Sequence, residues 1–180
     1  MAYRITRIEL AHFPNAAHVA EVLMEFGLPE QRIIGPIQDF ICNAPLVQGQ
    51  GYQKILSSRL ENHLRQELID DNDFVFTTPY YSPNLNERGD LAILKRETDT
   101  RVFVEIEFRP NVEKDLIKFQ IGHNNGRLVA AVLILAIDRL LINPTYHTMP
   151  EFSKAVRIVE ELTPEYPLLV VGVAGEHIDI

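Results

Sequence analysis

Apolar residues recur along the chain with two different spacings, and these spacings predict its helices and strands. Spacings of three and four, typical of amphipathic helices, predict helices over residues 15–26, 52–68, 112–121 and 151–162. Alternating or unbroken apolar runs predict strands over residues 3–10, 73–78, 90–95, 102–108, 128–137 and 168–173. Residues 33–52 carry several glycines and prolines, so we interpret them as a loop with at most a few strand residues.

Acidic residues interrupt two of these apolar strands. Asp90 opens the strand in the string GDLAIL, and Glu105 and Glu107 lie within VEIEF. Because strand side chains alternate between faces, the two glutamates share one face and the apolar residues beside them share the other. Like charges placed side by side need a compensating cation or proton, and oxygen ligands of this kind suit Mg²⁺ or Mn²⁺. We therefore expect these three acids to form an active site around a divalent ion.

Structural roles remain open for the same acids. The two glutamates could lie on an exposed sheet face and pair across strands with Arg101, Arg109 or Lys95. Asp90 follows an Arg-Gly pair and could be a turn residue at the entrance of a hairpin. The choice between catalysis and structure therefore depends on the surrounding elements.

Composition and charge limit the class of protein. A chain of 180 residues with 46% hydrophobic content can bury one sizeable core, so we expect a single domain. Cys42 is the only cysteine, and neither a secretory segment nor an apolar run of membrane-spanning length is present, so we expect a soluble cytoplasmic protein without a membrane partner. The net charge of -8 is unfavourable for binding nucleic acid, but residues 95–118 would become net positive with Mg²⁺ bound.

The order of elements and acids resembles the PD-(D/E)XK nuclease superfamily, and most of all the type II restriction endonucleases of the BamHI/BglII type. The matching strings are GDLAIL, VEIEF and, after a short gap, DLIKFQ, and the likeness extends over residues 52–174. The resemblance implies an α/β fold in which a mixed central β-sheet, an antiparallel meander plus parallel strands, is flanked by helices. It also implies one nuclease-like domain over residues 1–180, with its core at 52–174 and an N-terminal extension over residues 1–50.

The resemblance further implies a role for each acid. Asp90 and Glu105 would bind the metal ion together with the backbone carbonyl of Ile106. Glu107 stands where lysine is usual, and it would take the proton from the attacking water. Glu61 lies at the edge of the leucine stripe of the helix expected over residues 52–68, which makes it a candidate outer ligand; a solvated surface glutamate is the alternative interpretation.

Basic and aromatic residues near the acids are candidates for contacts with DNA. Lys118 falls outside the apolar stripe of the helix expected over residues 112–121, where it could act in catalysis at the scissile phosphate, and Lys114 lies one turn earlier on the same side. Arg109 follows the acidic strand directly. Tyr80 and Tyr81 could stack on a nucleobase, although packing within their own loop is the alternative.

These features lead to three hypotheses. The first is a Mg²⁺-dependent endonuclease, with Mn²⁺ as a substitute ion, that cuts double-stranded DNA at a specific site as a type II restriction enzyme. We expect it to be a homodimer, because two-fold protein symmetry matches a palindromic site. The second is a catalytically silent binding or assembly module with the nuclease fold, whose acidic surface meets a basic partner. The third is a structure-specific DNA or RNA nuclease of the same fold.

Overall fold

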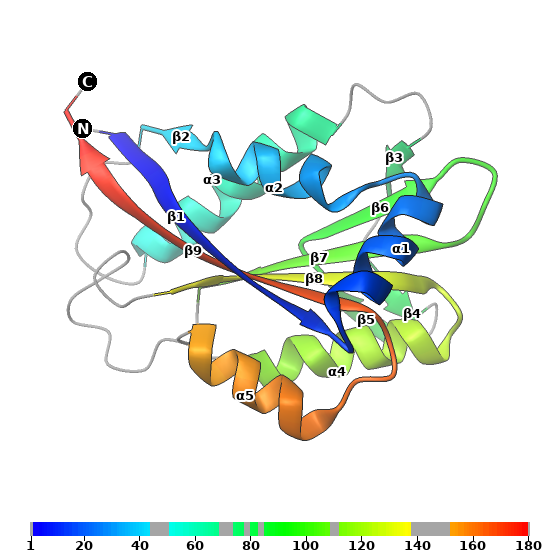
Figure 1. Ribbon diagram of the computed structural model, residues 1–180. Coiled ribbons are helices and arrows are strands. Elements are labelled where there is room, and N and C mark those ends of the chain that lie inside the picture. Colours follow the sequence, from blue (N-terminus) through cyan, green and yellow to red (C-terminus); the bar gives the residue numbers. More distant parts are fainter. Residues whose placement is uncertain are drawn as a thin grey trace.

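A mixed β-sheet forms the centre of the molecule (Figure 1). The computed structural model describes residues 2–43, 51–68, 74–77, 80–82, 85–108, 112–137 and 152–179. Over these residues the sheet has seven strands in the order β2-β1-β9-β8-β7-β6-β3. The bounds are β1 Ala2–Phe13, β2 Ile41–Cys42, β3 Phe74–Phe76, β6 Leu91–Lys95, β7 Arg101–Glu107, β8 Leu128–Ala136 and β9 Leu168–Ile178. A separate two-stranded sheet pairs β4 (Tyr80–Ser82) with β5 (Leu85–Arg88).

The strand directions confirm the predicted combination of a meander and parallel strands. Strand β6 runs antiparallel to both of its neighbours, β3 and β7, whereas β7, β8 and β9 are parallel. Strand β1 is antiparallel to β9 along its whole length, from the pair Ala2 and Ile178 to the pair Phe13 and Leu168. The first strand of the chain is therefore part of the same sheet as the strands that carry the acids.

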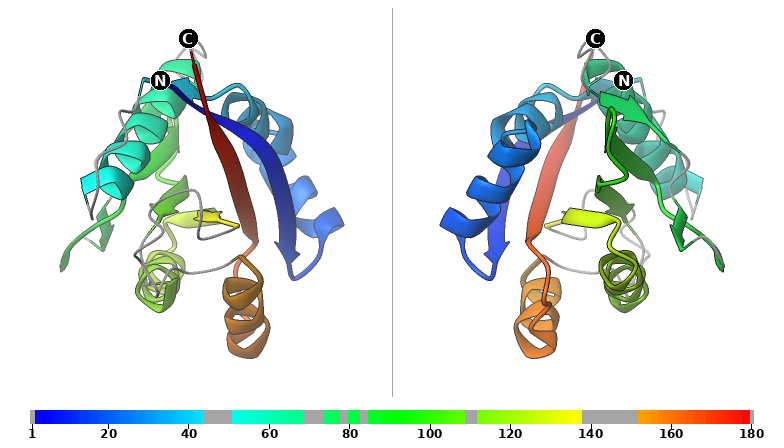
Figure 2. Two further views of the ribbon diagram at one scale, coloured as in Figure 1. Left: turned by 90° about the vertical axis from the view of Figure 1, so that its left-hand side faces the viewer. Right: turned by 90° about the vertical axis from the view of Figure 1, so that its right-hand side faces the viewer.

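Helices cover both faces of this sheet. Helices α1 (Ala16–Phe26), α2 (Glu30–Gln38) and α3 (Gly51–Leu68) pack on one face, and α4 (Val112–Asn124) and α5 (Phe152–Leu162) pack on the other. Figure 2 shows α4 and α5 together on the side of the sheet opposite to the other three. Strand β8 contributes alternate residues to the two apolar cores, as expected for a strand covered on both faces. Among the described residues, no helix combines the length and apolar character needed to cross a lipid bilayer.

Local sequence signals set the limits of the first helix. The side chain of Asn15 accepts a hydrogen bond of 2.9 Å from the backbone N–H of His18, which satisfies one of the free donors at the helix start. Gly27 ends the helix with φ of 90°, a left-handed conformation that glycine adopts without steric cost. The predicted start and end of this helix are both confirmed.

The loop predicted over residues 33–52 is wrong in its first part, where the structure contains the end of helix α2, whereas the short strand β2 agrees with the few strand residues expected there. Pro36 lies within α2, where it removes one helical hydrogen bond. Ile33, Ile34 and Ile37 are nevertheless buried on one face of the helix, and their packing against the core outweighs the unfavourable proline. Residues 44–50, in the second part of the predicted loop, lie outside the described residues.

Candidate active site

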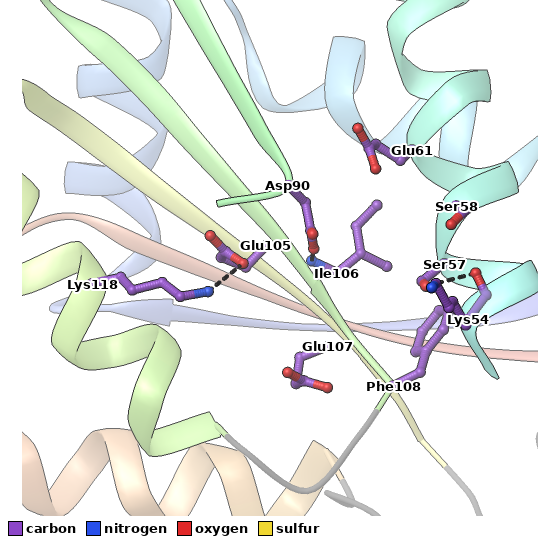
Figure 3. Close-up of a pocket in the computed structure, with 10 residues that line it drawn as sticks. All are labelled: Lys54, Ser57, Ser58, Glu61, Asp90, Glu105, Ile106, Glu107, Phe108 and Lys118. Carbon is purple, nitrogen blue, oxygen red and sulfur yellow. Dashed lines mark hydrogen bonds and ion pairs between the residues drawn. The ribbon is translucent and has the colours of Figure 1, made fainter. Parts of the chain in front are cut away.

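A cavity of about 250 Å³ lies where α3 and α4 approach the end of β7 (Figure 3). Helix α3 contributes one wall, α4 contributes Lys118, and the start of β6 and the end of β7 contribute the acids. The residues that line the cavity are Lys54, Ser57, Ser58, Glu61, Asp90, Glu105, Ile106, Glu107, Phe108 and Lys118. The structure thus brings together most of the residues that the sequence singled out.

Asp90 enters the cavity because the pairing of β6 with β7 ends beside it. The last paired residues are Leu91 and Val104, so the edge of β7 beyond Val104 has no β6 neighbour. There the Asp90 Oδ2 accepts a hydrogen bond of 2.7 Å from the backbone N–H of Ile106. In an antiparallel ladder the N–H and C=O of one residue point toward the same neighbour, so the Ile106 carbonyl faces the same opening.

Burial raises the pKa of Asp90 above its ordinary value, and the hydrogen bond from Ile106 and the charges of Lys118 and Arg65 oppose this shift. Asp90 is therefore more than a turn residue at the entrance of a hairpin. Its side chain lines the cavity and accepts a hydrogen bond from the unpaired edge of β7.

Glu105 is almost fully buried, with 3% of its surface exposed. The hydroxyl of Tyr81 donates to its Oε1 at 2.5 Å, and the Lys118 Nζ donates to its Oε2 at 3.1 Å. Burial, followed by the charges of Asp90 and Asp115, raises the pKa of Glu105 to about 8, against the opposing effects of Lys118 and Tyr81. The alternative hypothesis that Glu105 lies on an exposed sheet face is therefore wrong.

Lys118 is buried rather than solvated, although it lies outside the apolar stripe of α4. Its ammonium group also donates to the Asp115 Oδ1 at 2.8 Å, and Asp115 is only 2% exposed. Burial lowers the pKa of Lys118, but the neighbouring carboxylates of Glu105 and Asp115 outweigh this effect and leave it above its ordinary value. Burial also raises the pKa of Asp115, and its hydrogen bond with Lys118 opposes that shift.

Glu107 is half-buried and lines the same cavity (Figure 3). The predicted alternation along β7 is confirmed by the apolar residues, because Val104 and Ile106 pack in one core and Phe103 in the other. Within the described part of the chain, no three side chains of His, Cys, Asp or Glu are grouped so that they could hold a metal ion. The three expected acids thus line one cavity without forming a ready cluster of three carboxylates.

Glu61 lines the cavity from α3 and is held by an arginine of its own helix. The Arg65 Nη2 donates to the Glu61 Oε1 at 2.9 Å and to the backbone oxygen of Asp90 at 2.9 Å. Its guanidinium also lies 5.1 Å from the centre of the Phe76 ring. The solvated surface interpretation of Glu61 is therefore incomplete, since the residue helps to fix α3 beside Asp90.

The remaining candidates for contacts with DNA lie away from the cavity or outside the described residues. Lys114 is exposed near the start of α4 and is not among the residues that line the cavity. Arg109 lies outside the described residues. Tyr81 is fully buried in strand β4 and stacks on Phe103 of β7, with ring centres 4.3 Å apart, so it packs in the core rather than within its own loop.

Three residues of the site were not identified with these roles from the sequence: Arg65 and Asp115 were not named, and Tyr81 was considered only for stacking on a nucleobase or for packing in its loop. Two of them carry a signal that could have been used, because Arg65 follows Glu61 by four residues and Asp115 precedes Lys118 by three, the spacings of neighbours on a helix surface. No local signal connects Tyr81 with Glu105, since the contact joins β4 to β7.

Comparisons with known proteins agree with this architecture. The sequence matches the family described as "Restriction endonuclease BglII/BglIII" over residues 7–173. The restriction endonuclease BglII complexed with a DNA 16-mer has a similar structure, with a TM-score of 0.56, 12% identity and coverage of 97% of this chain and 81% of that chain. Free BglII gives a TM-score of 0.55, 16% identity and coverage of 97% and 82%. At 12% and 16% sequence identity, the structural likeness shows a shared fold only.

A search of curated proteins found no match. The family match nevertheless spans nearly the whole chain, and the mixed sheet flanked by helices corresponds to that of the BglII structures. The chain therefore belongs to the BglII/BglIII family of restriction endonucleases.

Proposed function

We propose that this protein is a Mg²⁺-dependent type II restriction endonuclease that cuts double-stranded DNA at a specific site. The single observation that carries the proposal is one cavity that gathers Asp90, Glu105, Glu107 and Lys118. Membership of the restriction endonuclease family supports the same reaction. We further propose that the chain acts as one nuclease-like domain, as a homodimer and in the cytoplasm.

The residues present fit a divalent cation. Asp90, Glu105 and the Ile106 carbonyl offer only oxygen donors, which suit Mg²⁺ and, as a substitute, Mn²⁺. The charge of Asp90 raises the pKa of Glu105, so two carboxylates share this space at an electrostatic cost that a cation would relieve. When bound, such an ion would stabilise the extra negative charge on the phosphate and lower the pKa of water. Glu61, tied to Arg65, would take at most an outer position.

The protein side chains would divide the remaining tasks. Glu107 reaches the cavity from the same strand as Glu105 and would accept the proton of the attacking water. Lys118 carries a positive charge at the cavity and would donate hydrogen bonds to the oxygens of the scissile phosphate. Lys114 is exposed one helical turn away and would contact a neighbouring phosphate. Arg109 stays a candidate for the same kind of contact.

Cleavage of unmethylated plasmids in Mg²⁺ tests the proposal, with Glu105→Ala as the variant and Glu160→Ala, an exposed glutamate on α5, as the matched control. We expect the wild type and the control to give discrete fragments. We expect Glu105→Ala to lose at least roughly 100-fold in rate, as removal of a metal ligand typically does. Circular dichroism must show that the variant is folded.

Other outcomes would distinguish the alternative functions. A ladder of products without discrete fragments would favour the structure-specific nuclease. No cleavage of any DNA or RNA and no binding of Mn²⁺ would favour the catalytically silent module. Equal rates for Glu105→Ala and the wild type would contradict the assignment of the site.

A further inference from the structure

The ammonium group of Lys118 lies between two buried carboxylates, and only one of them belongs to the proposed metal site. Its Nζ is 3.1 Å from the Glu105 Oε2 and 2.8 Å from the Asp115 Oδ1. The exposed fractions of the three side chains are 11% for Lys118, 4% for Glu105 and 2% for Asp115. A lysine held this deeply at a strand acid is an internal cation of the site rather than a surface charge.

The position of Lys118 conflicts with that of a second cation on Glu105. Both oxygens of the Glu105 carboxylate already accept hydrogen bonds, one from Tyr81 and one from Lys118. An ammonium group and a divalent ion on the same oxygen would repel each other strongly in so buried a place. A divalent ion can therefore bind the Glu105 Oε2 only if Lys118 gives up its contact or moves aside.

Asp115 can hold the ammonium group of Lys118 in position after it leaves Glu105. It lies one helical turn before Lys118 on α4, so the pair can persist without movement of the helix. Its other oxygen, Oδ2, is buried and accepts no hydrogen bond from a nitrogen or hydroxyl donor of the described residues, although the side chain of Glu107 also interacts with this carboxyl group. An ammonium group carries three donors, so on leaving Glu105 it could bond both oxygens of Asp115.

We propose that Lys118 is the internal counter-cation of ionised Glu105 in the metal-free protein, and that Asp115 is the positioning residue that retains Lys118 when a divalent ion binds Glu105. The inference rests on the proposed metal-dependent function and adds a residue to it. Asp115 would touch neither substrate nor metal ion, and it would act by setting how strongly Lys118 competes for Glu105.

Binding of Mn²⁺ in the absence of DNA, measured from the free ion by electron paramagnetic resonance, tests this in a double-mutant cycle of Asp115→Asn and Lys118→Met. We expect Asp115→Asn alone to weaken binding about tenfold, because Lys118 then stays on Glu105. In the Lys118→Met background the same change should have less than about a twofold effect. Glu113→Gln removes one charge from an exposed position of the same helix and should leave affinity unchanged.

An equal loss from Asp115→Asn in both backgrounds would overturn the inference, because the effect would then be direct electrostatics. No loss in either background would overturn it as well. Failure of the wild-type protein to bind Mn²⁺ would instead contradict the proposed metal dependence itself, and the inference would fall with it. The two failures are thus distinguishable.

If Lys118→Met does not fold, the ammonium signal of Lys118 in a ¹H–¹⁵N spectrum provides a second test. On addition of Mg²⁺ to the wild type, we expect this signal to shift while it stays protected from exchange with water. In Asp115→Asn the signal should be lost through exchange on the same addition. Retained protection in Asp115→Asn would overturn the role of Asp115.

Discussion

Close packing around Glu105 depends on a residue without a side chain. Gly89 directly precedes Asp90, and a Cβ atom at this position would overlap with the Glu105 Oε1 and lie 2.7 Å from the Tyr81 hydroxyl. Tyr81 itself is fixed by its stacking on Phe103 and cannot easily withdraw. The backbone before Asp90 can therefore approach the buried hydrogen bond between Tyr81 and Glu105 only because position 89 is glycine.

We predict that Gly89→Ala disrupts the site although it changes none of the charged residues. The added methyl group should displace Glu105 or Tyr81, at a cost of about 1–3 kcal/mol in the free energy of unfolding. Cleavage should fall at least roughly tenfold, because a small misplacement of a reacting group is costly. Urea unfolding and plasmid cleavage measure the two effects.

Gly35→Ala is the matched control for this change. Gly35 lies in α2, and the nearest side-chain atom of the described residues to a Cβ atom there would be that of Gln31, at 4.0 Å. Its stability should be unchanged or slightly higher, since alanine is favoured over glycine in a helix. Equal behaviour of the two variants would show that the contact at position 89 is unimportant.

The raised pKa of Glu105 predicts a pH dependence of stability in the metal-free protein. Its pKa is about 8 in the folded chain and 4.5 ordinarily, so between these values the folded state binds more protons than the unfolded state. This residue therefore makes stability fall as pH rises from about 4.5 to 8, by up to about 1.4 kcal/mol per pH unit.

Glu105→Gln should remove this contribution. The stability of the variant relative to the wild type should increase from pH 6 to pH 8 and level off above, as measured by urea unfolding with EDTA present. Parallel stability curves for the two proteins would be inconsistent with the raised pKa.

Among the secondary-structure elements, α3 and the start of β6 are joined by one arginine. Arg65 on α3 binds Glu61 of its own helix and the backbone oxygen of Asp90, and it also packs on the ring of Phe76 in β3. The leucine stripe of α3, buried as predicted, holds the helix on the core but does not define its distance from Asp90. Arg65 therefore sets the position of one wall of the cavity.

We predict that Arg65→Met weakens this connection while preserving much of the apolar contact. The loss of its charged hydrogen bonds should lower the free energy of unfolding by about 1–3 kcal/mol. The apparent Mg²⁺ concentration required for cleavage should rise, because Asp90 is less firmly held. Arg59→Met, at an exposed position of the same helix, is the control and should change neither quantity.

At the scale of the whole molecule, α4 and α5 present apolar residues to the solvent. Ile117 is 61% exposed and Leu162 is 57% exposed, and a groove of about 180 Å³ lies between them. Leu116 and Tyr166 line the same groove. Exposed apolar groups concentrated in one place are typical of surfaces that meet another protein, and this face suits the proposed homodimer.

We predict that replacement of both exposed residues by aspartate, Ile117→Asp with Leu162→Asp, converts a dimer into a monomer. Charges introduced in a buried apolar interface would lack compensation. Size-exclusion chromatography with light scattering gives the mass directly. Met24→Asp is the control, because Met24 is 64% exposed on α1 at the opposite face. A dimeric double variant would exclude this face as the interface.

Much of the fold follows from neighbouring residues and could be predicted from sequence. The cap at Asn15, the end at Gly27, the leucine stripe of α3 and the alternation along β7 are all local patterns. Local patterns did not predict α2, because the burial of its apolar residues against the core outweighs the unfavourable effect of Gly35 and Pro36 on the helix. They also could not indicate the small sheet of β4 and β5.

The sequence alone determined that Glu105 and Glu107 share one face of a strand and that Asp90 lies at the entrance of the neighbouring strand, because alternation and turn signals are properties of adjacent residues. Only the tertiary structure decided what surrounds Glu105, namely a tyrosine from β4 and a lysine from α4 that is held in turn by Asp115. These contacts join separate segments, and their strength depends on burial, which exists only once the sheet and both helical layers have packed.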